Sequence, residues 1–103
     1  MIKVSVLYPY AEDQPFDMDY YLGSHMPMVA DRLGEALKGS SVDQGVAGGG
    51  PGQPPPFAAV GHLVFESVEA FQTAFGPHTA EIMGDIPNYT ATTPTMQISE
   101  IRL

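Results

Sequence analysis

Residues 57–65 are the segment that most constrains how this chain can fold. They read Phe-Ala-Ala-Val-Gly-His-Leu-Val-Phe. Side chains of a β-strand alternate between the two faces of the sheet, and both sets are almost entirely apolar here. Apolar surface favours a position away from water, so both faces of this strand need cover. We therefore expect residues 57–65 to form a central strand of a sheet that is packed on both sides.

The first part of the chain predicts a strand followed by a helix. Residues 2–8 alternate apolar and polar side chains and are rich in β-branched types, which is typical of a strand. Asp17 is placed to cap a helix whose apolar pattern runs from Met18 to Leu37 and which we expect to end near Gly34. The apolar residues of that helix recur at spacings of three or four, as on one helical face (Leu22, Met26, Val29, Leu33 and Leu37). Pro27 lacks a backbone donor, so we expect a kink or interruption near Gly23–Pro27.

The second part predicts two further strands and one helical region around the central strand. Residues 38–47 carry a weak strand pattern, and residues 48–56 are a run of glycine and proline that suits a projecting loop. Residues 68–75 have an apolar helical face, and a further turn of helix is expected from Pro77 to Met83. Residues 95–103 alternate again and predict the last strand.

The resulting order is β-α-β-β-α-β, which is typical of a ferredoxin-like α+β fold. Right-handed crossovers then place the strands in the spatial order 4-1-3-2, within one domain that spans residues 1–103. The helices of such a fold cover one face of the sheet. Because residues 57–65 are apolar on both faces, we expect the other face to meet the sheet of a second copy, which makes a homodimer.

Charge and cysteine content exclude several classes of partner. Twelve carboxylates oppose four basic residues, so the net charge is −8. Nucleic acids and anionic membranes need clustered cations, and neither is expected as a partner. The chain has no cysteine, which excludes disulfides and thiolate metal sites. It opens directly on a strand pattern, with no signal peptide and no long apolar stretch, so a cytoplasmic location is expected.

Four short segments resemble parts of a known protein family. Residues 20–29, Tyr-Tyr-Leu-Gly-Ser-His-Met-Pro-Met-Val, look like the signature of the first helix of the EthD family, within the dimeric α+β barrel superfamily. Residues 74–78, 85–89 and 97–101 are similar to later parts of the same family. The resemblance spans nearly the whole chain and implies a dimer in which two four-stranded sheets close into a barrel.

The resemblance also implies a range of functions. The family takes its name from the degradation of ethyl tert-butyl ether, in which its member accompanies a monooxygenase system. The superfamily includes cofactor-independent monooxygenases, lactone isomerases, decarboxylases and haem proteins, so the fold alone does not select a reaction. We expect a protein that acts on or binds a hydrophobic organic compound. The alternative is a non-catalytic, dimeric ligand-binding or accessory protein.

His25 is the first candidate for chemistry. On a helical wheel it lies about 60° from the centre of the apolar stripe, with Tyr21 and Arg32 on the same flank. In a pocket between this helix and the sheet, His25 could act as general base, Tyr21 could orient it or donate, and Arg32 could bind an oxyanion. The alternative is that His25 donates to a backbone carbonyl at the proline interruption.

The other histidines give less specific predictions. His62 lies on the central strand, where it either converges with His25 or makes a structural hydrogen bond at the dimer interface. His78 begins a helical turn, where it could close a pocket mouth with Tyr89 or simply be exposed, and Met18 could supply an adaptable pocket wall. No two histidines share the spacing of a metal site, so no metal, haem or other cofactor is expected.

Overall fold

Four strands form one antiparallel sheet in the order β2-β3-β1-β4. The computed structural model describes all residues from 1 to 103. The strands are β1 (Ile2–Pro9), β2 (Gly39–Gln44), β3 (Phe57–Phe65) and β4 (Thr95–Glu100). Strands β1 and β3 are central, and every neighbouring pair is antiparallel. The predicted 4-1-3-2 order is confirmed, and the first, second and fourth strands differ from prediction only at their ends.

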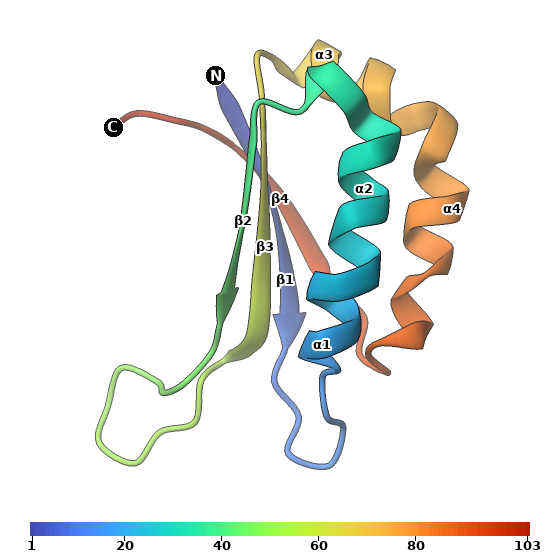
Figure 1. Cartoon of the computed structure of the whole chain (residues 1–103). Helices are drawn as coiled ribbons and strands as arrows, with labels where there is room; N and C mark the ends of the chain where they lie inside the picture. Colours follow the sequence, from blue (N-terminus) through green and yellow to red (C-terminus); the bar gives the residue numbers. More distant parts are fainter.

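The helices lie on one face of this sheet (Figure 1). They are α1 (Met18–Tyr20), α2 (Met26–Leu33), α3 (Val68–Phe75) and α4 (Thr79–Gly84). The predicted interruption of the first helix is a π-helical turn over Tyr21–His25, in which the N–H of Met26 bonds the carbonyl of Tyr21. Such turns insert one extra residue into a helix and are frequent at functional sites. Pro27 follows directly after this turn.

Side chains and glycine set the helical ends, as the sequence indicates. The carboxylate of Asp17 accepts from the N–H of Tyr20 at 3.0 Å, and the hydroxyl of Ser67 accepts from the N–H of Ala70 at 3.0 Å. Each bond satisfies a backbone donor that the first helical turn leaves free. At the other end of α2, Gly34 adopts a φ of 59°, which a residue without Cβ tolerates.

The core between helices and sheet has two parts with different chemistry. One part is mainly aliphatic with two phenylalanines, and lies under α2, α3 and α4 (Val4, Val29, Leu33, Leu63, Phe65, Phe71 and Ile82). The other is rich in tyrosine and lies where β1, the π-helical turn and the segment after α4 meet (Tyr8, Tyr21, Ala59, Ile86 and Tyr89). Phenolic hydroxyls need partners when they are buried, so this second part is where polar chemistry enters the core.

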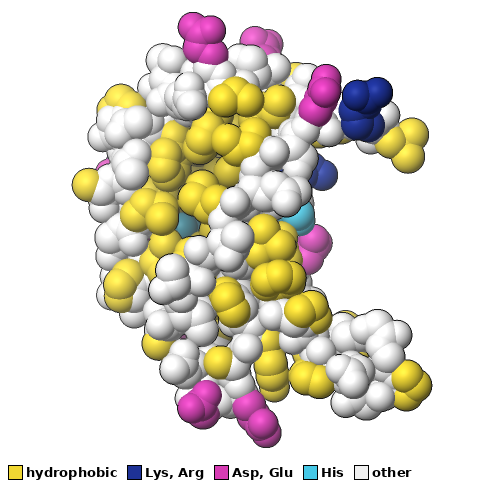
Figure 2. Space-filling model, turned by 180° about the vertical axis from the view of Figure 1, so that it is seen from behind, with side chains coloured by type: hydrophobic (Ala, Val, Ile, Leu, Met, Phe, Trp, Pro, Cys, Tyr) yellow, Lys and Arg dark blue, Asp and Glu magenta, His cyan; other side chains and the backbone are white.

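The opposite face of the sheet carries no helix. Leu7 pairs with Val60 there, and Val64 lies further along β3 on the same face. The loop between β2 and β3 and the residues after β4 both extend past this face, which makes it concave (Figures 1 and 2). None of the helices is long and apolar enough to cross a membrane.

Removing the largest apolar side chain at the centre of the aliphatic core tests this description of the packing. Phe65 has no exposed surface and packs edge-on against Phe71 at a centroid distance of 5.2 Å. We expect Phe65→Ala to lower the free energy of unfolding by about 3–5 kcal/mol in urea titrations, because it leaves a cavity. Val46→Ala, at a side chain that is 89% exposed, is the control and should change stability by less than about 0.5 kcal/mol. Equal effects would contradict the assigned core.

Candidate functional site

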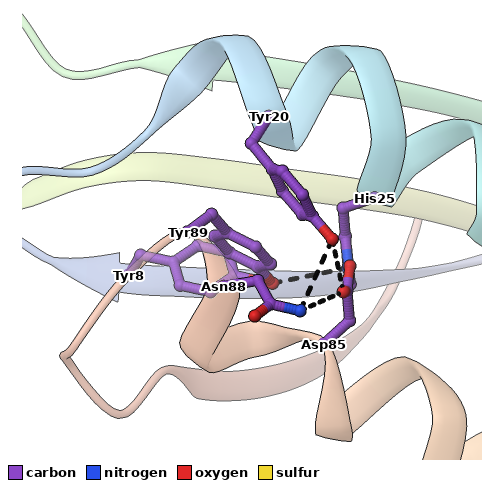
Figure 3. A network of polar contacts seen from close by, with 6 residues as sticks. All are labelled: Tyr8, Tyr20, His25, Asp85, Asn88 and Tyr89. Carbon is purple, nitrogen blue, oxygen red and sulfur yellow. Dashed lines mark hydrogen bonds and ion pairs between the residues drawn. The ribbon is translucent and has the colours of Figure 1, made fainter.

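A buried histidine and a carboxylate form the centre of the tyrosine-rich end of the core. His25 is the last residue of the π-helical turn and is only 4% exposed. Its Nδ1 lies 2.9 Å from Oδ2 of Asp85, which follows the end of α4 (Figure 3). The contact joins the first helical region of the chain to the last, across 60 residues of sequence.

Asp85 is held in place by two further donors. The Tyr20 hydroxyl donates to Oδ1 at 2.7 Å, and the amide of Asn88 donates to the same oxygen at 2.8 Å. Burial disfavours the ionised carboxyl, but the hydrogen bonds from Tyr20, Asn88 and His25 together keep the pKa of Asp85 below its usual value. Asp85 is therefore a carboxylate at neutral pH, and the bond to it raises the pKa of Tyr20.

His25 is neutral beside this carboxylate. Burial lowers the pKa of His25 below its usual value, although Asp85 acts in the opposite direction. A carboxylate can only accept, so the single proton of the neutral ring sits on Nδ1 and donates to Asp85. Nε2 is then a free base. Its nearest partner is the Tyr89 hydroxyl at 3.4 Å, which is longer than an ordinary hydrogen bond.

Two tyrosine hydroxyls continue from Nε2 towards the sheet, and the ring of a third tyrosine packs on the imidazole. The hydroxyls of Tyr89 and Tyr8 are 2.7 Å apart. The ring of Tyr21 stacks on the His25 imidazole with a centroid distance of 5.4 Å and an angle of 14°. Burial raises the pKa of Tyr8, Tyr21 and Tyr89 far above the ordinary tyrosine value. All three therefore remain protonated and act as hydrogen-bond donors or acceptors without charge.

A small cavity lies between the helices and the sheet and reaches this group. Its volume is about 30 Å³, enough for one or two water molecules at about 15 Å³ each. Twelve of its 14 lining residues are hydrophobic, and the lining includes Tyr8, Tyr21 and His25. Figure 2 shows the opening as a hollow among yellow side chains with one histidine inside it. Met83 and Met96 also line the cavity and are 37% and 39% exposed, so flexible side chains flank its mouth.

The structure brings together part of the predicted set of site residues. His25 and Tyr21 both line the cavity, as the helical spacing predicts. Tyr89 lies directly behind them and contacts His25, although it is not part of the lining. Met18 packs against the tyrosine-rich core outside the cavity.

The other predicted residues lie elsewhere. Arg32 forms a bidentate ion pair with Glu81 on the helical surface, at 2.8 and 3.0 Å, and does not reach the cavity.

His62 is on the open face of the sheet, bonded to Ser5 at 3.0 Å and to Asp43 at 3.0 Å, so it does not converge with His25. His78 is not among the cavity residues.

Four members of the polar group are not predicted by the sequence analysis. Tyr8 is identified only as a strand residue, and Tyr20, Asp85 and Asn88 only as parts of the EthD-like segments. A signal for Asp85 does exist, because a carboxylate and an amide sit three positions apart in Asp-Ile-Pro-Asn-Tyr directly after a helix. Nothing local in the sequence pairs that segment with His25, because tertiary packing alone brings the two together.

Comparison with known proteins identifies the family. A protein-family model described as the EthD domain matches residues 10–93, which is most of the chain. The chain belongs to the EthD family. A crystal structure of an EthD-like protein from Ralstonia eutropha JMP134 shares 48% identity and superposes with a TM-score of 0.95, over 99% of this chain and 92% of that one.

More distant structures of the same fold are also similar. An EthD family protein from Bacillus halodurans C-125 has 19% identity and a TM-score of 0.70, over 99% of both chains. A protein from Arabidopsis thaliana has 14% identity and the same TM-score, over 100% of this chain and 97% of that one. No curated protein matches this EthD-family chain.

The lowered pKa of His25 predicts a specific dependence of stability on pH. When the pH falls below about 6.5, the unfolded chain protonates this histidine while the folded chain does not, so the stability that the neutral ring provides is lost. Thermal unfolding between pH 7 and pH 5 should show a falling midpoint for the native protein and a flatter profile for His25→Gln. The contribution of Asp85 lies below about pH 4, outside this window. Parallel profiles for the two proteins would contradict the assignment.

Proposed function

We propose that this EthD-family protein binds a small apolar organic compound in the cavity and that His25 moves a proton to or from it. The observation that carries the proposal is the state of His25. Its Nδ1 is occupied by Asp85, and its Nε2 is a weakly bonded base beside an apolar cavity. A base in this setting typically accelerates proton transfer by about 10²–10⁴-fold.

The arrangement suits three types of reaction. Cofactor-independent oxygenation, isomerisation and decarboxylation each place negative charge on a carbon or oxygen of the substrate at one step. A neutral imidazole backed by a carboxylate removes or returns the proton at that step, and the carboxylate stabilises the imidazolium that forms. The apolar lining excludes water from the same place, which strengthens these electrostatic interactions. No Asp, Glu, Lys or Arg side chain lines the cavity, so the neutral imidazole of His25 is the proposed centre of any proton transfer.

Exchange of carbon-bound protons tests the proposal directly. The probe is 2-tetralone, an apolar ketone with acidic C–H bonds, followed by proton NMR in deuterium oxide. We expect the protein to accelerate exchange, and His25→Gln to remove about 10²–10⁴-fold of the enhancement. Asp85→Asn should also reduce it, by at least about tenfold, because the ring loses the partner that fixes its tautomer.

His78→Gln is the matched control, since His78 lies outside the cavity, and it should exchange the probe as the native protein does. Saturable binding of 2-tetralone without any exchange would leave the alternative, a ligand-binding or accessory protein. An unchanged rate in His25→Gln would remove His25 from the chemistry.

We also propose that a second copy of the chain covers the open face of the sheet. Leu7, Val60 and Val64 give this face an apolar centre, and half of the surface of a central strand is left without helical cover. The face is concave and is flanked by the β2–β3 loop and the C-terminal residues (Figure 2), a shape that suits another sheet. Dimer interfaces of about 800 Å² for each partner are typical.

Light scattering tests the proposed dimer. The native protein should have twice the chain mass of 11.0 kDa at micromolar concentration. Val60→Lys places a charge at the centre of the open face and should yield the monomer, because a buried unpaired charge strongly disfavours association. Ala30→Lys adds the same charge on the exposed side of α2 and should leave the dimer intact. A monomeric native protein would overturn the proposal.

A further inference from the structure

The hydroxyl of Tyr21 occupies an unusual position in the cavity. Tyr21 is 2% exposed, yet its hydroxyl makes none of the side-chain hydrogen bonds of the structure. Every fully buried side-chain oxygen and nitrogen does have a partner, so this hydroxyl keeps access to the cavity that Tyr21 lines. It points at Gly61 of β3, where a Cβ would overlap it. Glycine at this position of the central strand therefore leaves the room that the hydroxyl occupies.

The neighbouring hydroxyls have a fixed order of donation. The Nδ1 proton of neutral His25 is used by Asp85, so Nε2 can only accept, and Tyr89 is the donor in the weak 3.4 Å contact between them. The one proton of Tyr89 is then committed, so the 2.7 Å contact has Tyr8 as donor and Tyr89 as acceptor. The proton of Tyr8 is committed in turn. At the cavity, the oxygen of Tyr8 can therefore only accept a hydrogen bond.

The hydroxyls of Tyr8 and Tyr21 require opposite hydrogen-bonding groups of a ligand. Tyr8 offers an acceptor to the cavity, and Tyr21 has a proton that it can give. No side-chain hydrogen bond joins these two hydroxyls, so a ligand hydroxyl can lie between them. A carbonyl or an ether can accept from Tyr21 but has nothing to donate to Tyr8. A hydroxyl both donates and accepts, and so fits both residues.

We infer that the ligand of this cavity carries a weakly acidic hydroxyl, a phenol or an enol, on an apolar body, and that this hydroxyl binds between Tyr8 and Tyr21. The inference rests on the proposed binding function and names the class of compound. The apolar body is required because 12 of the 14 lining residues are hydrophobic. The mouth must widen for such a ligand, and the exposed methionines Met83 and Met96 can move to permit this.

The same order of donation gives His25 a route to the ligand proton. The ligand O–H bond breaks as its proton passes to Tyr8, Tyr8 passes its own proton to Tyr89, and Tyr89 passes its proton to Nε2. One proton leaves the ligand and one N–H bond forms on His25, with no change in oxidation state. The products are a ligand oxyanion that accepts from Tyr21 and an imidazolium that faces the carboxylate of Asp85. Donors placed at such an oxyanion are each worth about 10²–10³-fold in rate.

A pair of chromophores tests the inference. 4-Nitrophenol carries the required hydroxyl, and its neutral and ionised forms absorb at different wavelengths, while 4-nitroanisole has the same body with a methyl ether. We expect the native protein to bind 4-nitrophenol at least about tenfold more tightly, because the ether leaves the Tyr8 oxygen without a donor. Tyr8→Phe removes this acceptor and should reduce that ratio to nearly one, whereas Tyr21→Phe should weaken the binding of both probes. Tyr10→Phe, at an exposed tyrosine outside the group, is the matched control and should keep the native ratio.

A second variant separates binding of the hydroxyl from its ionisation. Tyr89 does not line the cavity, so Tyr89→Phe should retain most of the affinity for 4-nitrophenol. In the native protein, the ionised fraction of bound 4-nitrophenol should exceed that of the free compound at the same pH. Tyr89→Phe should lose this excess, which a purely structural role for Tyr89 would not affect. Circular dichroism of each variant identifies any that fails to fold. If Tyr8→Phe does not fold, the weaker binding of both probes by Tyr21→Phe tests the assigned site in its place.

The outcomes distinguish this inference from the function on which it rests. Equal affinity for the two probes, unchanged in Tyr8→Phe, would overturn the preference for a hydroxyl and leave the binding cavity in place. Absence of binding by either probe would overturn both. A tenfold preference that survives in Tyr21→Phe and in Tyr8→Phe would show that the hydroxyl binds elsewhere, and would overturn the assigned site.

Discussion

The hydrogen bond between His25 and Asp85 determines most of what the tyrosine-rich end of the core can do. It joins the π-helical turn to the segment after α4, which are far apart in the sequence. It also fixes the tautomer of the imidazole, and with it the direction in which Tyr89 and Tyr8 donate. A single half-buried carboxylate thus sets the order in which the hydroxyls of Tyr89 and Tyr8 donate. Tyr20 and Asn88 contribute indirectly, because they keep that carboxylate ionised despite its partial burial.

The two parts of the core divide stability and chemistry between them. The mainly aliphatic part buries Val4, Phe65 and their neighbours with no polar atoms to satisfy, so it stabilises the fold at no electrostatic cost. The tyrosine-rich part buries rings of similar size, but each brings a hydroxyl that needs a partner. A cavity at this end is therefore lined by apolar rings and by a few directed polar atoms, the usual composition of a small-molecule site.

The sequence predicts the fold far better than it predicts the site. Apolar residues on both faces of residues 57–65 and the order of elements are sufficient for the sheet, because these signals are local and repeat along the chain. His25 and Tyr21 follow from the same helical periodicity. Arg32 shares their flank on a wheel but lies seven residues on, about 10 Å along the axis, where Glu81 binds it. The position of Asp85 beside His25 depends on contacts between distant segments, which the periodicity of the sequence does not indicate.

The sequence also did not determine which face of the sheet His62 occupies, since both faces of β3 are apolar. In the structure, Gly61 faces the cavity and His62 faces the open side with Ser5 and Asp43. The lining of the cavity comes entirely from one face of this one chain, and the proposed dimer contact lies on the other face. Consecutive residues of β3 therefore serve separate purposes. Substitutions on the open face act on association without removing any group that touches the cavity, and those at Gly61 act on Tyr21 without touching the open face.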